Sequence, residues 1–208
     1  MGRLLALALL AVLGAALWWR KHPSACPYGQ RFWVEAPHPL ITRERLRAVL
    51  APRDGERILE IGPGTGYYTL DLAAWVGSGA LEMLDLQQEM LDHTMARAGD
   101  RGISNLTPTL ADATTLPYAD ASFDAVVLIT TLGEIPDRES AIGEIARVLR
   151  PGGRLVVGEL FGDPHFTTPG DVERLGRASG LLLEQRSGPW VGFFARLSKP
   201  TGDDGPAG

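Results

Sequence analysis

Apolar residues recur with two different spacings along the chain, and segments of the two kinds alternate from residue 40 onward. Short apolar runs bounded by turn residues are typical of buried strands, and apolar positions three and four residues apart are typical of helices that pack on a core. The pattern predicts helices at 40–50, 67–76, 87–98 and 171–179, one further helix capped by Asp137 and stopped by Pro151, and strands at 57–61, 80–84, 106–110, 125–130, 154–160, 181–186 and 191–197.

This alternation predicts the fold class. Strands separated by helices form βαβ units, which place the strands in a mostly parallel, doubly wound α/β sheet with helices on both faces. The last two predicted strands, 181–186 and 191–197, have no helix between them. We therefore expect them to pair as an antiparallel hairpin at the edge of the sheet.

The run from residue 4 to residue 19 carries no charged side chain and is followed by Arg20 and Lys21. As a helix it would span roughly 24 Å, slightly less than a ~30 Å hydrocarbon core. Trp18 and Trp19 stand where interfacial tryptophans stand in membrane anchors, which favours an anchor over residues 1–22. An export signal, a lipidated Cys26 and a buried soluble helix are the alternatives, although no small-residue cleavage site follows the run.

Residues 23–39 contain five proline or glycine residues and are predicted to form an irregular connector. The connector also holds an aromatic cluster that includes Tyr28, Phe32, Trp33 and His38. The cluster packs on the surface of the domain, forms a lid over a ligand cleft, or forms a patch that meets a membrane surface. The domain itself is expected over residues 40–199, with a frayed tail at 200–208.

The composition excludes several classes of protein. The 208 residues carry 20 Lys and Arg against 25 Asp and Glu, a net charge of −5, which argues against a nucleic-acid-binding protein. The chain is 45% hydrophobic, enough for a real core. With one cysteine, Cys26, and four histidines, neither a disulfide framework nor a metal site is expected.

The first chemical signal is a glycine-rich turn directly after the strand predicted at 57–61. It reads Glu60-Ile61-Gly62-Pro63-Gly64-Thr65-Gly66 and opens the next helix. Glycines let the backbone turn tightly and approach a ligand closely, and the amides of the following helix can donate to it. A dinucleotide fingerprint would need a third glycine where Tyr67 stands, so the turn alone is weak evidence.

Two acidic residues follow the next two predicted strands. Asp85 comes 19 residues after Gly66, where doubly wound folds place a carboxylate that accepts hydrogen bonds from a ribose. Asp112 and Ala113 follow the third strand, where a carboxylate suits an adenine amine and a small side chain leaves room for the ring. Taken separately, each residue also has an explanation without a ligand: Asp85 as the cap of the next helix, and Asp112 as a solvated turn aspartate. Together with the glycine turn they predict a nucleoside-binding edge of the sheet.

These signals, with Leu149-Arg150-Pro151-Gly152-Gly153, resemble the class I S-adenosylmethionine-dependent methyltransferases, in particular the small methyltransferase type 11 group. The resemblance covers roughly residues 40–198. It implies a Rossmann-like sheet of seven strands in the order 3-2-1-4-5-7-6, with strand 7 antiparallel. It also implies S-adenosylmethionine as cofactor, held by Glu60, Gly62, Gly64, Gly66, Asp85, Leu86, Asp112 and Ala113.

A sulfonium methyl group is electrophilic enough for direct displacement, so such a protein mainly aligns the acceptor and excludes water. No obvious catalytic dyad is present. Glu134 and His165 are the candidate catalytic residues, because they follow the fourth and fifth strands and could hold or remove a proton. Glu159 and His38 are further candidates for the acceptor side.

A membrane anchor and an aromatic connector favour a small or lipid-like lipophilic acceptor at a membrane surface. The basic residues Arg20, Lys21 and Arg31 outnumber Arg3 on the other side of the run, which predicts a cytoplasmic catalytic domain. Methylation of a soluble metabolite and a non-catalytic, tethered cofactor-binding protein are the alternatives. The sequence leaves open which atom accepts the methyl group and whether the chain forms oligomers.

Overall fold

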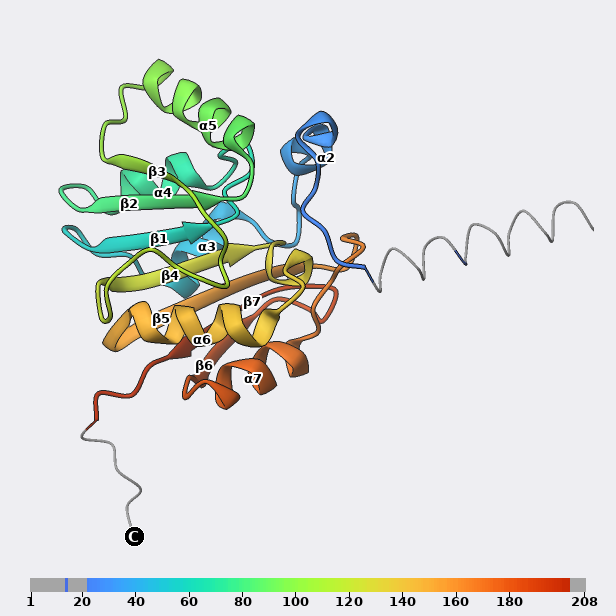
Figure 1. Ribbon diagram of the computed structural model, residues 1–208, viewed down its shortest axis with the longest axis vertical. Helices are drawn as coiled ribbons and strands as arrows, with labels where there is room; N and C mark the ends of the chain where they lie inside the picture. Colours follow the sequence, from blue (N-terminus) through green and yellow to red (C-terminus); the bar gives the residue numbers. More distant parts are fainter. Residues whose placement is uncertain (1–13, 15–21, 203–208) are drawn as a thin grey trace, which may run out of the picture.

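The structure, a computed structural model, describes residue 14 and residues 22–202. Its centre is one seven-stranded sheet in the order β3-β2-β1-β4-β5-β7-β6 (Figure 1). Strands β1 to β5 pair in parallel, and β7 runs antiparallel to both β5 and β6. The strands are β1 (Arg57–Ile61), β2 (Ala80–Asp85), β3 (Leu106–Leu110), β4 (Phe123–Ile129), β5 (Leu149–Leu160), β6 (Leu182–Ser187) and β7 (Gly192–Ser198).

The expected α/β fold, its strand order and its antiparallel edge hairpin are confirmed. Helices cover both faces of the sheet because successive strand side chains point to opposite sides. On β1, Ile58 packs in the cluster that includes α3, α4 and α5, whereas Leu59 and Ile61 pack in the cluster of α6 and α7. The helices are α2 (Phe32–Glu35), α3 (Arg43–Leu50), α4 (Thr69–Trp75), α5 (Gln88–Asp100), α6 (Arg138–Val148) and α7 (Pro169–Ala178), with single 3₁₀ turns η1 (Tyr28–Gln30) and η2 (Leu132–Glu134).

Several boundaries differ from the sequence prediction. Helix α3 begins at Arg43 rather than residue 40, because the Thr42 side chain caps it by accepting from the Arg45 amide at 3.3 Å. Helix α6 ends at Val148, and β5 begins at once and includes Pro151, where a helix stop and a later strand were expected. A residue before proline avoids helical backbone, which explains the early end.

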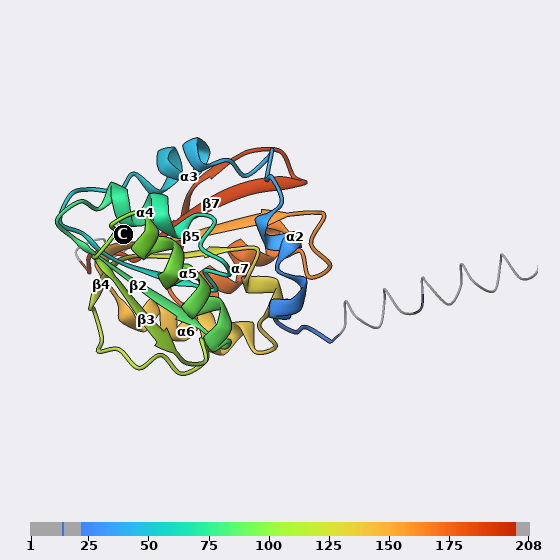
Figure 2. The same cartoon turned by 90° about the horizontal axis from the view of Figure 1, so that it is seen from above.

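The connector is more ordered than predicted, because η1 and α2 interrupt it. In both views it lies beyond the carboxyl ends of the parallel strands (Figures 1 and 2). No helix among residue 14 and residues 22–202 is long and apolar enough to cross a membrane. The run predicted as a membrane anchor lies outside the described residues except for Gly14, as do residues 203–208 of the predicted tail.

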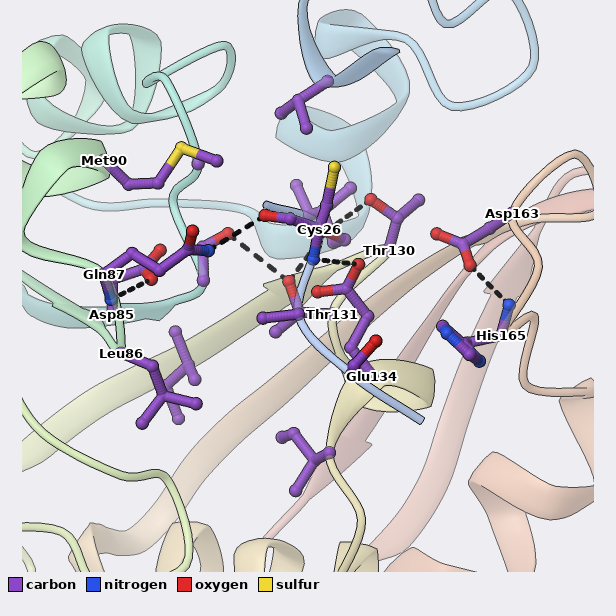
Figure 3. A pocket seen from close by; sticks show the side chains of 18 of the residues that line it. Cys26, Asp85, Leu86, Gln87, Met90, Thr130, Thr131, Glu134, Asp163 and His165 are labelled. Carbon is purple, nitrogen blue, oxygen red and sulfur yellow. Dashed lines mark hydrogen bonds between the residues drawn. The ribbon is translucent and has the colours of Figure 1, made fainter. Parts of the chain in front are cut away.

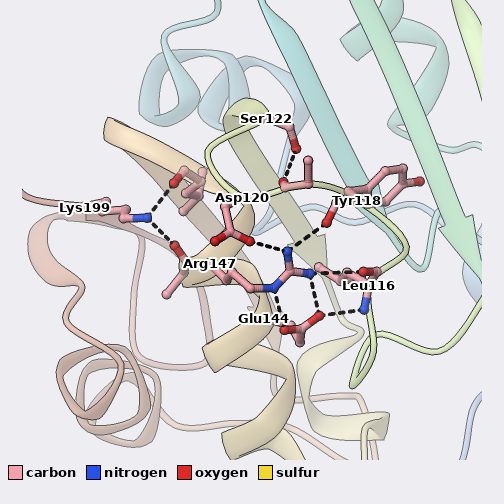
Figure 4. A network of polar contacts seen from close by, with 10 residues as sticks. Leu116, Tyr118, Asp120, Ser122, Glu144, Arg147 and Lys199 are labelled. Atoms are coloured by element: carbon pink, nitrogen blue, oxygen red, sulfur yellow. Dashed lines mark hydrogen bonds and ion pairs between the residues drawn. The ribbon is translucent and has the colours of Figure 1, made fainter.

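The long segment between β3 and β4 is fixed to α6 by one arginine (Figure 4). Arg147 donates to the carbonyl oxygens of Tyr118 at 2.8 Å and Leu116 at 3.1 Å, and pairs with Asp120 and Glu144 at 2.7 Å. Glu144 in turn accepts from the Leu116 amide at 2.8 Å. Because this segment begins just after β3, the network also fixes one wall of the site described next.

Candidate active site

A cavity of about 590 Å³ opens at the carboxyl ends of the parallel strands. Its walls come from the loops that follow β1, β2, β3, β4 and β5, and from the connector. This is the edge where ligands bind in open α/β sheets. Ten of the lining residues are labelled in Figure 3.

The glycine turn after β1 forms the floor of the cavity. Gly62 and Gly64 line it with φ angles of +68° and +55°, which residues with a Cβ rarely adopt. A Cβ on Gly64 would lie 2.7 Å from Cγ1 of Val34, on the connector. The turn therefore brings the backbone up to the cavity and leaves no space for a side chain.

Two of the predicted cofactor residues lie outside the lining. Gly66, at φ +81°, faces α5, where a Cβ would approach Thr94 Cγ2 to 2.8 Å, so packing explains this glycine. Glu60 is buried beneath the turn, and its Oε2 has no hydrogen-bond partner among the described residues. Burial raises the pKa of Glu60 to about 7.

Residues at the end of β2 and just after β3 line the cavity. Asp85 is nearly buried and accepts from the Gln87 amide at 2.9 Å, and burial raises its pKa. Leu86 beside it is 57% exposed, an apolar surface available to a flat ring. Asp112 accepts from the Thr114 amide at 2.8 Å, and Ala113 follows it in the wall. Carboxylates that accept hydrogen bonds, a turn without side chains and an apolar surface together fit an adenosine group.

The opposite wall carries titratable groups from the loops after β4 and β5. Glu134 and His165, both predicted from the sequence, line the cavity together with Asp163. Burial and the neighbouring Asp163 raise the pKa of Glu134 to about 8. Asp163 accepts from the His165 amide at 2.6 Å, and burial raises the pKa of this carboxyl as well. With its pKa of about 8, the carboxyl group of Glu134 can hold or accept a proton near neutral pH.

Glu159 is placed differently from the expectation. It is almost fully buried in β5, outside the cavity lining, and accepts from the Thr167 amide at 3.1 Å. Burial raises the pKa of Glu159 to about 8, as for Glu134, but its carboxyl does not reach the cavity. Glu159 lies one residue before the end of β5 and Glu134 lies five residues after the end of β4, and the sequence alone did not show which carboxyl reaches the cavity. No group of three or more His, Cys, Asp or Glu that could hold a metal occurs among the described residues.

The connector closes one side of the cavity and joins its two walls (Figure 3). The Cys26 amide donates to Glu134 at 3.2 Å. The Gln87 side-chain amide donates to the Cys26 carbonyl oxygen at 2.9 Å and accepts from the Tyr28 amide at 3.0 Å. A segment over 100 positions away from Glu134 in sequence is thus fixed to both walls.

The rest of the connector is fixed through its aromatic residues. His38 lines the cavity, and its Nδ1 lies 2.9 Å from the hydroxyl of Tyr68, which donates to the Ile41 carbonyl oxygen at 2.6 Å. Trp33 also lines the cavity, whereas its neighbour Phe32 is not part of the lining.

Sequence reasoning missed Gln87, Asp163 and Thr130. Gln87 stands two residues after Asp85, and Asp163 stands two residues before His165, so closeness in sequence to a predicted site residue was the available signal. Thr130 adopts φ +52°, a strained backbone for a non-glycine residue, in the cavity wall just after β4. Strained backbone conformations are frequent at functional sites, and the local sequence pattern does not predict them.

This mostly parallel sheet of seven strands, with β7 antiparallel, has the strand order that the resemblance to class I methyltransferases implied. Residues 58–153 match the family model described as a methyltransferase domain. Over 115 residues the chain is 39% identical to the ubiquinone/menaquinone biosynthesis C-methyltransferase UbiE of Cellvibrio japonicus, an alignment covering 54% of this chain and 46% of that protein.

A second relative is the 27-O-demethylrifamycin SV methyltransferase of Amycolatopsis mediterranei, 37% identical over 123 residues, with 57% of this chain and 43% of that protein covered. The chain spans about half the length of these curated relatives. The crystal structure of a SAM-dependent methyltransferase from Aquifex aeolicus superposes with a TM-score of 0.77 at 17% identity, covering 84% of this chain and 100% of the other. Residues 58–153 are therefore similar to a methyltransferase domain, and the fold is shared with a solved SAM-dependent methyltransferase.

Proposed function

We propose that the protein transfers a methyl group from S-adenosylmethionine to a small, lipophilic acceptor by in-line displacement. The observation that carries this proposal is a continuous cavity, which joins a wall suited to an adenosine group with a wall of buried carboxyl groups. An in-line reaction needs donor and acceptor in one enclosed space from which water is excluded.

In this proposal one wall of the cavity binds the methyl donor, and the other faces the acceptor. When bound, S-adenosylmethionine supplies an electrophilic methyl carbon. Gly62 and Gly64 give it backbone without side chains, and the Asp85 and Asp112 carboxylates accept its hydroxyl and amine hydrogens. The connector covers the reacting groups by way of its bonds to Gln87 and Glu134.

Glu134 takes the proton that a hydroxyl, amine or activated carbon acceptor loses on methylation. Its carboxyl lines the cavity, and its raised pKa keeps it a competent base near neutral pH. His165, buried in the same wall, serves as an orienting group or a second proton acceptor.

The lipophilic acceptor is inferred from the cavity and from the sequence before it. Leu86, Met90, Trp33 and Leu160 give the lining apolar surface. The chain also carries the uncharged run at residues 4–19, which we propose tethers the protein to a membrane with its catalytic domain on the cytoplasmic side. The relatives named above are C- and O-methyltransferases, which leaves the accepting atom open.

One experiment tests the acceptor class. The purified full chain is incubated with methyl-labelled S-adenosylmethionine and, separately, a lipid extract, a soluble metabolite extract, or RNA with protein. Label in the lipid phase is the expected result. Label mainly in the soluble metabolites would support the alternative acceptor, and binding of the methyl donor without any transfer would support a non-catalytic protein.

A second experiment tests the tether. Membrane fractionation of the full chain is compared with Leu10→Arg/Leu13→Arg and, as matched control, Leu10→Ile/Leu13→Ile. We expect the arginine variant to leave the membrane fraction and the isoleucine variant to stay, because a charge in a hydrocarbon core is costly. Equal partitioning of all three would refute the tether.

A further inference from the structure

Large apolar side chains are exposed around the mouth of the cavity. Phe32 is 57% exposed, Trp33 65%, Phe161 53% and Trp190 49%, with Val191 beside them. We call these five residues the rim patch. Scattered apolar residues are normal on protein surfaces, but aromatic residues gathered at one site mark a contact surface.

The rim patch surrounds the cavity on two sides. Trp33 belongs to its lining, and on the other side the residues directly after Phe161, from Gly162 to His165, line it as well. The Phe161 amide donates to the Val191 carbonyl oxygen at 2.8 Å, which joins the end of β5 to the hairpin between β6 and β7. In Figures 1 and 2, α2, this hairpin and the loop after β5 all lie at the same end of the molecule.

Ring contacts with the protein core hold Phe161 and Trp190 of the rim patch in place. The ring of Phe166, which is almost fully buried, lies 5.2 Å from that of Trp190 and 6.2 Å from that of Phe193. The rings of Phe161 and Trp190 are 5.6 Å apart. These side chains are therefore presented outward by fixed contacts and do not collapse onto the surface.

The chemistry of the patch indicates what covers it. The loop residues Ser187 to Gly192 and the pair Phe161-Gly162 contain no charged side chain, and they include the tryptophan and phenylalanine that suit a lipid interface. The apolar run at residues 4–19 ends five positions before Ser24, and Ser24 lines the cavity. A bilayer that holds the run is therefore within reach of the patch.

We propose that the rim patch inserts into the lipid interface, so that the mouth of the cavity opens onto the bilayer. This inference rests on the proposed function and extends it. A lipophilic acceptor then passes from the membrane into the cavity without crossing water. Because the patch carries no charge, its contact with lipid is apolar and depends little on salt.

The test uses the full chain in a Cys26→Ser background, with an environment-sensitive nitrobenzoxadiazole label on Val191→Cys. The matched control carries the label on Arg101→Cys, an exposed position at the end of α5, before β3 begins. Both are mixed with vesicles of phosphatidylcholine and phosphatidylglycerol, with and without spin-labelled lipid. If Val191→Cys does not fold, Phe161→Cys carries the label instead.

We expect the Val191 label to shift to shorter wavelengths and to be quenched by the spin-labelled lipid, at low and at high salt, while the Arg101 label does neither. Equal behaviour of the two labels overturns the proposal. So does a Val191 label that is already shifted before vesicles are added and does not respond to them, because the apolar run or a second copy then covers the patch. Calorimetry of S-adenosylmethionine binding to the same proteins keeps the two proposals apart: intact binding without a shift refutes only the membrane face.

Discussion

The two walls of the cavity are built in different ways. The wall after β1, β2 and β3 consists of short segments that follow directly from paired strands, so the sheet fixes Gly62, Asp85 and Asp112. The wall after β4 and β5 depends on contacts between distant parts of the chain, such as the Cys26 amide on Glu134. The first wall is a property of the fold, and the second is a property of this chain.

This difference fits a common donor and a variable acceptor. A wall fixed by strand ends presents the same backbone geometry in any protein with this sheet. A wall made from a connector and two loops changes its shape and its pKa values with a few substitutions. The predictions below disturb the two walls separately, beginning with the largest expected effect.

Gly64→Val disrupts the first wall at the glycine turn. The φ of +55° costs a residue with a Cβ about 1–2 kcal/mol, and the new side chain also meets Val34. We expect no saturable S-adenosylmethionine binding by calorimetry at concentrations that saturate the wild type. Gly143→Ala, on an exposed face of α6 with open space around it, is the control and should bind normally. Normal binding by a folded Gly64→Val would show that the turn does not hold the donor.

Glu134→Gln removes the proposed general base from the second wall. Loss of a general base costs roughly 10²–10⁴ in rate, so we expect a fall of about 10² or more in kcat with unchanged donor affinity. With a pKa of about 8, the carboxylate of the wild type gains population as pH rises, and kcat/KM should rise through that range. The variant should lack this rise.

The matched control is Glu159→Gln, because burial raises the pKa of that carboxyl similarly but outside the cavity lining. Both carboxyls bind their protons more tightly in the folded chain, so their ionisation costs stability as pH rises from about 4.5 towards 8. Wild type should lose unfolding free energy relative to either variant over that range. If Glu159→Gln also loses the activity profile, the base is not Glu134.

How far the sequence predicts each wall follows from the same comparison. The alternation of helices and strands predicts the sheet, and Gly62, Asp85 and Asp112 are visible because each stands at the end of a strand or within two residues after it. Gly66 shows the limit of such reading, since its φ of +81° serves packing against Thr94. The bonds of Gln87 to the connector join residues about 60 positions apart, and no local pattern encodes them.

Asp85→Ala weakens the first wall without blocking it. If the carboxylate accepts buried hydroxyls, its loss costs about 1–3 kcal/mol, a roughly 5- to 150-fold rise in Kd for S-adenosylmethionine. Asp100→Ala, an exposed aspartate at the end of α5, serves as the control and should leave Kd unchanged. Equal Kd values for the two variants would remove Asp85 from the donor site.

Gln87→Ala produces the smallest effect, because it releases the connector and leaves both walls intact. The change removes the donor to the Cys26 carbonyl oxygen and the acceptor of the Tyr28 amide, at about 0.5–1.5 kcal/mol for each hydrogen bond. Hydrogen exchange of amides 26–30 should therefore quicken by about tenfold, since 1.4 kcal/mol is a factor of ten in an opening equilibrium. Gln88→Ala is the control, because Gln88 is exposed and its side chain bonds only to Asp92 among the contacts described. Exchange at 26–30 that is equally fast in both variants would mean that Gln87 does not hold the connector. If exchange quickens in Gln87→Ala and the donor also dissociates faster, the connector joins the two walls functionally as well as structurally.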